Sequence, residues 1–203
     1  MKPLIVAATQ FEIQDCIPLL EEKNIPYLIT GVGMTATAYA LGKSLAINGN
    51  YSYVLNVGIA GSFDKKIALG EVVNILTDTF YELGAEDGDN FITIDKLGFG
   101  RATYSSKFNH SNIKLKTCNG ITVNKVHGNE DSIQKVCTKH PDVTTESMEG
   151  AAVFYVCHQE NTPCVQVRSI SNYVEHRDKS TWEITLALKN LNGWLKNYIE
   201  KNY

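Results

Sequence analysis

Short apolar runs rich in β-branched residues alternate along this chain with longer stretches in which apolar residues recur at helical spacing. Several of the short runs are apolar at every position, which is typical of interior strands buried on both faces. Because strands and helices alternate, the pattern predicts an α/β fold, a three-layer sandwich around a mixed, largely parallel sheet. The predicted strands cover residues 4–8, 27–30, 53–57, 72–76, 121–126 and 164–170, and the predicted helices cover residues 11–22, 35–47, 132–139, 149–159 and 181–202.

Two of the predicted helices carry further signals. The last one follows Ser180-Thr181-Trp182-Glu183, which has the form of a capping box, so its start is expected within a residue or two of Thr181. The helix at 149–159 is apolar on nearly all sides and is expected in the middle of the fold. Its first residue, Glu149, is therefore an acidic side chain in a buried setting. Residues 84–90, rich in Gly and acidic residues, are predicted to form a surface loop.

The composition bounds the class of protein. With 203 residues, of which 43% are hydrophobic and 20% charged, the chain is expected to form one domain over residues 1–203. The formal charge of −3 includes no long run of either sign, which argues against nucleic acid or a membrane surface as partner. No apolar segment is long enough for a signal peptide or a membrane span, so a cytoplasmic location is expected. The 5 cysteines show neither a C-x-x-C pair nor zinc-ligand spacing, so no metal site is expected.

A glycine-rich turn, Gly31-Val32-Gly33-Met34-Thr35-Ala36, lies between a predicted strand and a predicted helix and matches the dinucleotide-binding pattern G-x-G-x-x-A. Dinucleotide sites place an acidic residue about 20 residues further on, where it binds a ribose hydroxyl. Residues 50–59 contain neither Asp nor Glu. We therefore interpret the motif as a tight turn beside a smaller ligand, and no cofactor is expected.

A second turn of small residues, Asn56-Val57-Gly58-Ile59-Ala60-Gly61-Ser62, follows a buried strand. Missing side chains there allow a flat ligand to approach the backbone of Ala60 and Gly61, although a plain tight turn accounts for the segment equally well.

Three polar side chains are predicted at one edge of the sheet. Glu12 follows the first strand, Asn172 follows the last one, and Glu149 begins the buried helix. Each has an ordinary explanation when taken alone, since acids complement helix starts and strand ends turn polar for solvation. Open α/β sheets, however, bind ligands at the carboxyl ends of their strands. The three side chains are therefore predicted to meet in one site.

Two segments carry a family resemblance. Residues 146–152 (ESMEGAA) and 167–172 (VRSISN) resemble the paired signatures of the nucleoside phosphorylase and nucleosidase superfamily. Within it, the chain is similar to the futalosine hydrolase family along essentially its whole length. This second similarity rests on residues 31–40 (GVGMTATAYA), 56–64 (NVGIAGSFD), 83–89 (LGAEDGD) and 177–182 (RDKSTW).

The resemblance implies a nucleoside phosphorylase-like fold, a small-molecule nucleoside substrate and a homodimer or larger homo-oligomer. It also implies hydrolysis of the N-glycosidic bond of futalosine, an inosine-like nucleoside with a carboxyphenyl-ketone tail at its 5′ position. The products would be hypoxanthine and dehypoxanthine futalosine, in the futalosine route of menaquinone biosynthesis.

The same resemblance implies roles for the candidate residues. Glu12 would deprotonate the attacking water, Glu149 would bind the ribose hydroxyls and stabilise the oxocarbenium-like centre, and Asn172 would donate to N7 of the base. The other substrate-binding candidates are Ala60 and Gly61 at the second turn, Met148 against the sugar, Asn129 in a loop near the base, and Arg168 as support for the loop of Asn172.

Asn172 bears on the choice of base. Nucleosidases of this superfamily that act on adenine nucleosides have Asp there, which protonates N7. An amide cannot protonate N7, but it can donate to N7 and to a 6-oxo group, which favours hypoxanthine. The scarcity of arginine favours water over phosphate as nucleophile, because the first hundred residues contain none and related phosphorylases take their phosphate-binding arginines largely from that half.

Several alternatives stay open from the sequence. The chain could be an aminodeoxyfutalosine or methylthioadenosine-type nucleosidase that releases adenine, a purine nucleoside phosphorylase, or a non-catalytic purine-binding protein. The group that binds a tail carboxylate is open among Arg101, His127 and the lysines, and the sequence fits His127 equally well as a structural histidine.

Overall fold

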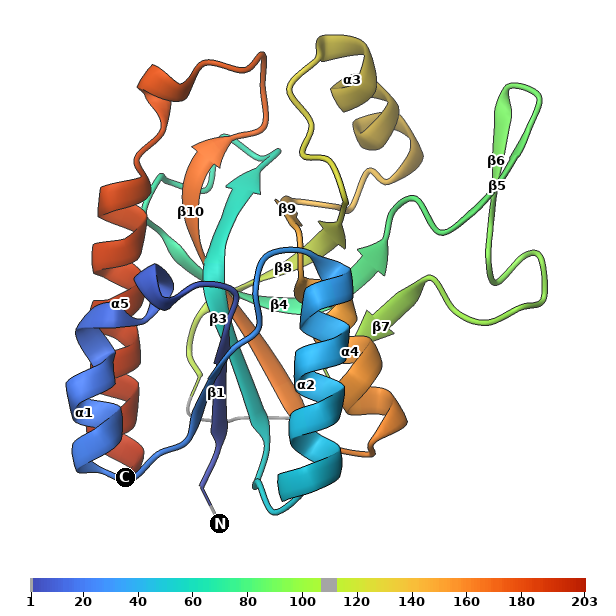
Figure 1. Ribbon diagram of the computed structural model, residues 1–203. Coiled ribbons are helices and arrows are strands. Elements are labelled where there is room, and N and C mark those ends of the chain that lie inside the picture. The colour runs from blue at the N-terminus through green and yellow to red at the C-terminus, as the bar shows by residue number, and fades with distance from the viewer. Residues whose placement is uncertain (1, 107–112) are drawn as a thin grey trace.

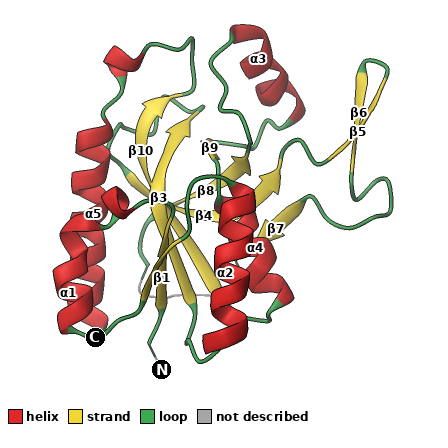
Figure 2. Cartoon of the chain, viewed as in Figure 1, coloured by secondary structure: helices red, strands yellow, loops and turns green. Residues whose placement is uncertain are grey.

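The strands of the computed structural model form one large sheet and one hairpin (Figures 1 and 2). The structure describes residues 2–106 and 113–203. Within these residues the strands are β1 (Leu4–Ala7), β2 (Tyr27–Ile29), β3 (Val54–Ser62), β4 (Val72–Phe80), β5 (Gly84–Asp87), β6 (Asn90–Thr93), β7 (Thr103–Ser105), β8 (Lys116–Thr122), β9 (Thr145–Ser147) and β10 (Cys164–Tyr173).

The large sheet runs in the order β10-β4-β8-β9-β3-β1-β2, and β7 pairs with β4. Its strand pairs are both parallel and antiparallel, so the predicted mixed sheet is confirmed. One further pairing, between β10 and β3, closes part of the sheet into a ring from which β1 and β2 extend. The sequence did not predict this ring, because strand pairing across long separations leaves no periodic signal.

The described helices are α1 (Ile17–Glu22), α2 (Met34–Asn48), α3 (Glu130–Lys139), α4 (Gly150–Gln159) and α5 (Ile184–Asn202), with 3₁₀ turns η1 (Gln10–Glu12), η2 (Gln14–Cys16) and η3 (Lys179–Thr181). None of these helices is long and apolar enough to cross a membrane.

Side-chain alternation along β1 shows why its residues are apolar at every position. Ile5 and Ala7 lie in a core cluster with residues of α5, whereas Leu4 and Val6 lie in a second cluster with residues of α2 and α4. Successive strand residues point to opposite faces, so a strand covered on both sides has no polar face. Figure 2 shows α1 and α5 on one side of the sheet and α2 and α4 on the other, which confirms the three-layer prediction.

Two predicted helix starts were wrong. The segment predicted as one helix at 11–22 consists of η1, η2 and α1, because Pro18 has no N–H to donate and is accommodated only in the first turn of α1. The last helix begins at Ile184 rather than near Thr181. Asp178 accepts hydrogen bonds from the backbone N (2.9 Å) and hydroxyl (2.6 Å) of Ser180, so the Ser180 side chain caps no helix and η3 forms instead.

One strand prediction and one loop prediction also changed. The strand predicted at 121–126 is β8, which starts earlier and ends at Thr122. Residues 84–90, predicted as a surface loop, form most of the exposed β5–β6 hairpin, which projects to the right in Figure 1. The short strands β7 and β9 were missed, since three residues are too few to show a period of two.

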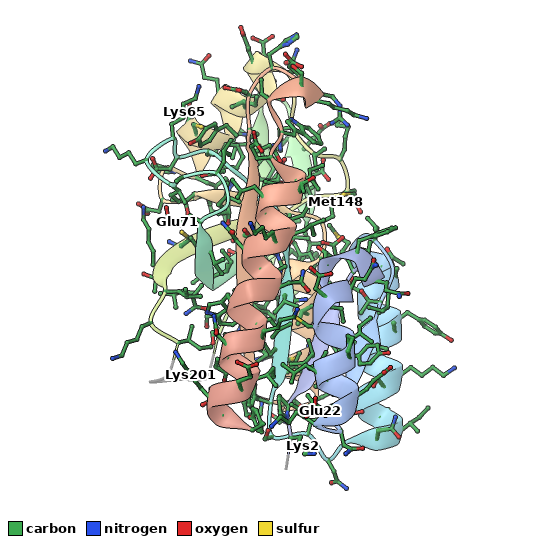
Figure 3. All side chains as sticks on the ribbon, turned by 90° about the vertical axis from the view of Figure 1, so that its left-hand side faces the viewer. Lys2, Glu22, Lys65, Glu71, Met148 and Lys201 are labelled. Carbon is green, nitrogen blue, oxygen red and sulfur yellow. The ribbon has the colours of Figure 1, made fainter. Side chains whose placement is uncertain are left out.

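The parallel pairing of β1, β3 and β10 places their carboxyl ends at the same edge of the sheet. In Figure 3, Met148 lies toward this end of the molecule, whereas Lys2, Glu22 and Lys201 lie toward the other end. Ligand crevices of α/β sheets lie outside this carboxyl edge, so a ligand is expected at the loops that follow these three strands.

Candidate active site

A cavity of about 490 Å³ opens at the carboxyl edge of β1, β3 and β10. Of the residues predicted to form a site, Glu12, Ala60, Gly61, Met148, Glu149 and Asn172 line it together. They come from η1, the end of β3, the start of α4 and the end of β10. Three segments far apart in the sequence thus bring two carboxylates and an amide to one space.

Glu12 is held by backbone donors on both carboxylate oxygens. Oε2 accepts from the backbone N of Thr9 at 2.9 Å, and Oε1 accepts from the backbone N of Ile59 at 3.2 Å. The side chain is only 8% exposed, and burial raises the pKa of the Glu12 carboxyl above its usual range. A Cβ at Gly58 would lie 2.8 Å from Oε1, so the missing side chain there lets the carboxylate lie against β3.

Glu149, predicted as the first residue of a helix, is the N-cap of α4, which begins one residue later at Gly150. Its Oε1 accepts a hydrogen bond of 2.9 Å from the backbone N of Gly33. Gly33 has a φ of +94°, a conformation that favours glycine, and this conformation belongs to the turn that carries its N–H toward the carboxylate. The glycine motif that resembles a dinucleotide fingerprint therefore holds a carboxylate of the site.

Arg168 does not line the cavity but lies beneath it, only 2% exposed. Its Nη2 donates to Asn56 Oδ1 at 2.6 Å. Burial lowers the pKa of the guanidinium, while the charges of Glu149, Glu12 and Asp78 act in the opposite direction. This buried cation favours ionisation of Glu12, because its charge offsets part of the cost of burying that carboxylate.

Asp78 fixes the start of α4 from below. The fully buried carboxyl accepts from Thr122 Oγ1 at 2.8 Å and from Gln166 Nε2 at 2.7 Å. Thr122 Oγ1 in turn accepts from the backbone N of Ala151 at 2.7 Å. Burial raises the pKa of Asp78 to about 6. The network anchors the helix turn that follows Glu149, so it contributes to the position of that carboxylate.

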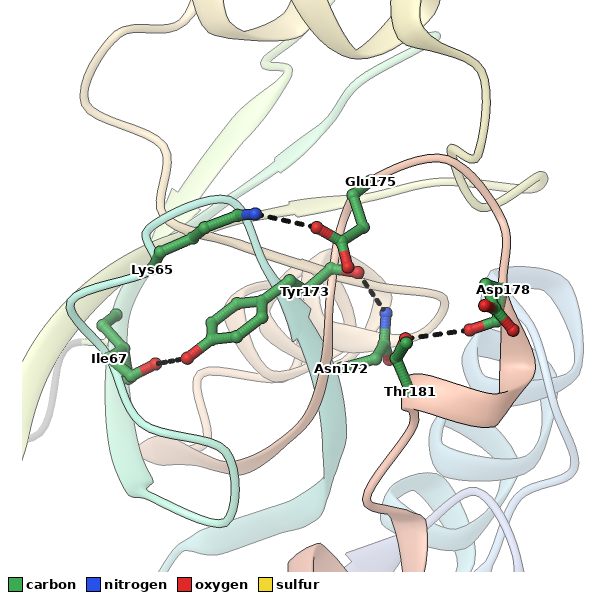
Figure 4. Close-up of polar contacts among 7 residues, drawn as sticks. All are labelled: Lys65, Ile67, Asn172, Tyr173, Glu175, Asp178 and Thr181. Carbon is green, nitrogen blue, oxygen red and sulfur yellow. Dashed lines mark hydrogen bonds and ion pairs between the residues drawn. The ribbon is translucent and has the colours of Figure 1, made fainter.

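Asn172 presents an amide whose orientation its neighbours determine. Its Oδ1 accepts from Ser171 Oγ at 2.8 Å. Its Nδ2 donates to the backbone O of Tyr173 at 3.0 Å, a bond that Figure 4 shows. The following residues are tied to the loop after β3, since Tyr173 donates to the backbone O of Ile67 and Glu175 pairs with Lys65 at 2.8 Å. One N–H of the Asn172 amide remains available to a ligand.

One wall of the cavity is apolar and was not predicted. Phe11 of η1, which is 73% exposed, faces this space together with Trp182, Ile184 and Leu188, and η1 packs against α5. The guanidinium of Arg177 lies 5.0 Å from the centre of the Trp182 ring. Among the described residues, Arg177 is the only lysine or arginine that lines the cavity. Phe11 and Trp182 lie in segments that were wrongly predicted as helix starts, so the sequence did not indicate that they line the site.

His127 and Glu146 also line the cavity. The sequence leaves His127 open as a partner for a substrate carboxylate or as a structural histidine, and the structure pairs its Nδ1 with the Glu146 carboxylate. Glu146 lay within the signature ESMEGAA without an assigned role. Its position three residues before Glu149 was the sequence signal that it belonged to the same edge.

Besides Arg168, two other candidates do not line the cavity. Asn129 is the N-cap of α3, where its Oδ1 accepts from the backbone N of Asp131 at 3.1 Å and of Ser132 at 3.3 Å. Arg101 lines a different pocket, near Phe80 and Tyr104. In the described part of the chain, no three His, Cys, Asp or Glu side chains gather as metal ligands would.

Sequence comparison finds a matching family model and related proteins. A family model described as the phosphorylase superfamily matches residues 16–200. Futalosine hydrolase from Streptomyces coelicolor is 29% identical over 170 residues, which cover 79% of this chain and 72% of the relative. The 5′-methylthioadenosine/S-adenosylhomocysteine nucleosidase of Colwellia psychrerythraea is 26% identical over 191 residues, which cover 86% of this chain and 77% of the relative.

Solved structures share the fold. Native futalosine hydrolase of Helicobacter pylori superposes with a TM-score of 0.81 at 15% identity, covering 99% of this chain and 98% of the other. The Colwellia psychrerythraea nucleosidase in complex with adenine superposes with a TM-score of 0.77 at 22% identity, covering 99% and 95% of the two chains. The likeness of architecture therefore extends over the whole described chain.

Proposed function

This chain belongs to the phosphorylase superfamily, and from that premise we propose that it is an N-ribosyl hydrolase that splits futalosine into hypoxanthine and dehypoxanthine futalosine. The relatives named above are nucleosidases and futalosine hydrolases. One observation carries the proposal: Glu12, Glu149 and Asn172 line a single cavity. Cleavage of a ribosyl–purine bond needs a base for the attacking water, an anionic group near the sugar and a donor to the departing base, and these three side chains can supply them.

The reaction joins a water oxygen to C1′ and breaks the C1′–N9 bond, whose electron pair leaves with the base. The sugar gains positive charge and the base gains negative charge on the way to the transition state. Glu12 takes a proton from the attacking water, and that proton reaches the departing base. Glu149 holds the ribose hydroxyls and stabilises the positive sugar, while the free N–H of Asn172 donates to N7 of the base.

Two features favour a 6-oxopurine nucleoside with an acidic tail. The Asn172 amide donates without protonating, which suits a base that can carry negative charge across N7 and a 6-oxo group. The apolar wall with Arg177 suits an aromatic tail that ends in a carboxylate, because a guanidinium binds carboxylates and aromatic side chains pack against rings. A methylthio group, by contrast, offers no partner for that cation.

The direct test is detection of the free base after incubation with futalosine, aminodeoxyfutalosine, inosine or methylthioadenosine, each with and without phosphate. Hypoxanthine released from futalosine alone, independently of phosphate, supports the proposal. Adenine release indicates an aminodeoxyfutalosine or methylthioadenosine-type nucleosidase, and dependence on phosphate indicates a phosphorylase. Binding without any product indicates a purine-binding protein.

Arg177 provides a test of tail recognition. Replacing it by Met removes the cation and keeps an apolar side chain beside Trp182. We expect kcat/KM for futalosine to fall about 10-fold, the effect of losing one partly solvated, charge-assisted hydrogen bond. The methyl ester of futalosine, whose tail is neutral, should be cleaved equally by both proteins. The matched control is Lys179→Met in the same loop, and equal losses for acid and ester would remove Arg177 from tail binding.

The raised pKa of Glu12 predicts the acid limb of the pH profile. A general base acts only when ionised, and burial favours the neutral form of this carboxyl. As the pH falls, kcat/KM for futalosine should therefore decline at a pH above the ordinary glutamate value of 4.5. The measurement is kcat/KM across the acid range, with circular dichroism to show that the protein stays folded. A decline in kcat/KM that appears only at or below pH 4.5, the ordinary glutamate pKa, would contradict the role of Glu12.

A further inference from the structure

His127 and Glu146 form a pair in the cavity wall that the proposed reaction does not use. The Glu146 carboxylate binds His127 twice, at ring atom Nδ1 and at the backbone N, which donates to Oε1 at 3.0 Å. The side chains are only 9% and 3% exposed, yet both residues line the cavity. The carboxylate therefore fixes both the loop and the ring.

The surroundings of the ring leave one polar atom for a ligand. The rings of Tyr81 and Phe63 contact the His127 ring in T-shaped arrangements, with centroid distances of 5.3 Å and 6.4 Å. Nδ1 is bound to Glu146, and no described residue forms a hydrogen bond with Nε2. A carboxylate on one ring nitrogen holds the hydrogen there, so in the neutral ring Nε2 presents a lone pair.

Strand register places this pair opposite Asn172. Glu146 of β9 is the partner of Gly61 of β3, and Gly61 is also the partner of Asn172 of β10. Adjacent strands lie about 4.8 Å apart, so β9 and β10 are separated here by ~10 Å across a residue without a side chain. A Cβ at Gly61 would come within 3.2 Å of Asn172 Nδ2. Because Gly61 has no side chain, a flat bicyclic base has room against β3, with Asn172 on one side and the Glu146–His127 pair on the other.

We propose that His127, held by Glu146, is a specificity-determining residue that accepts a hydrogen bond at Nε2 from the N1–H of a 6-oxopurine base. A 6-oxopurine carries hydrogen on N1, whereas a 6-aminopurine presents a lone pair there that would face the lone pair of Nε2. Asn172 and His127 thus read different atoms of the base. This inference rests on the proposed N-ribosyl hydrolase function and adds a second determinant of its base preference.

The experiment compares the affinities of hypoxanthine and 1-methylhypoxanthine by calorimetry. Methylation removes the N1–H and leaves the 6-oxo group, N7 and the shape of the ring system otherwise unchanged. Wild-type protein should bind hypoxanthine at least 10-fold more tightly, the value of roughly one hydrogen bond in a buried site. In His127→Leu the ratio should fall close to one. Glu146→Gln, which keeps the shape but loses the charge, should give an intermediate ratio.

His140→Leu is the matched control, because the His140 ring also packs against Tyr81, at 5.5 Å, but lies outside the cavity. It should keep the wild-type ratio. A ratio near one in wild-type protein, or a wild-type ratio in His127→Leu, overturns the inference. If futalosine is hydrolysed but the two bases bind equally, only the role of His127 fails, whereas absence of both hydrolysis and base binding refutes the proposed function itself.

Discussion

Replacement of Glu12 by Gln is expected to lower the rate of hypoxanthine release from futalosine by 10²-fold or more, the usual contribution of a general base. An amide keeps the size of the side chain and can still accept from the backbone N of Ile59, but it cannot take a proton from water. Affinity for hypoxanthine should change little, because Glu12 contacts the water that attacks C1′, whereas the base departs from the other side of C1′. The expected signature is therefore a loss in kcat with nearly constant base binding.

Single-turnover measurement of base release, together with calorimetric binding of hypoxanthine, separates these two quantities. Glu22→Gln is the matched control, since Glu22 ends α1 at the far end of the molecule from the cavity. A thermal melt of each variant tests whether the loss of a charge near Arg168 unsettles the fold. Near-normal turnover in Glu12→Gln would remove Glu12 from the mechanism, and a different group would have to act as the general base.

The layers of the fold could be predicted from the sequence because they follow from local periodicity. Strands apolar at every position are required wherever helices cover both faces of a sheet, as Leu4 and Ile5 of β1 show by packing into different cores. The convergence of Glu12 and Asn172 was predictable for a related reason. Parallel strands present their carboxyl ends at one edge, so polar residues that follow two such strands meet there.

Features that depend on long-range pairing could not be predicted. β9 has three residues, yet its pairing with β3 brings the Glu146–His127 pair beside Gly61. The burial of Arg168 could not be predicted either. Side-chain alternation assigns Arg168 to one face of β10, but it does not show that Glu12 and Glu149 lie close to its guanidinium. Asn129 was assigned to the site for its polar loop, but the same features describe an N-cap, which is what the structure contains.

Replacement of Asn172 by Asp is expected to shift base preference toward 6-aminopurines. A carboxyl at this position would lie near the backbone O of Tyr173, which now accepts from the Asn172 amide, and an ionised carboxylate would be repelled by that oxygen. The protonated form is therefore favoured, and it can give its proton to N7 of a departing adenine. Adenine leaves poorly as an anion, so proton transfer at N7 should raise its release far more than that of hypoxanthine.

We expect the ratio of kcat/KM for aminodeoxyfutalosine to that for futalosine to rise by roughly 10²-fold, the lower range for a general acid. Chromatography of both bases from a mixture of the two substrates gives this ratio within one reaction. Asn124→Asp is the matched control, because Asn124 is exposed and lies outside the cavity. A variant with the wild-type ratio would show that Asn172 does not read the base. The preference would then depend on other cavity groups, of which His127 is the one whose Nε2 distinguishes N1–H from a lone pair.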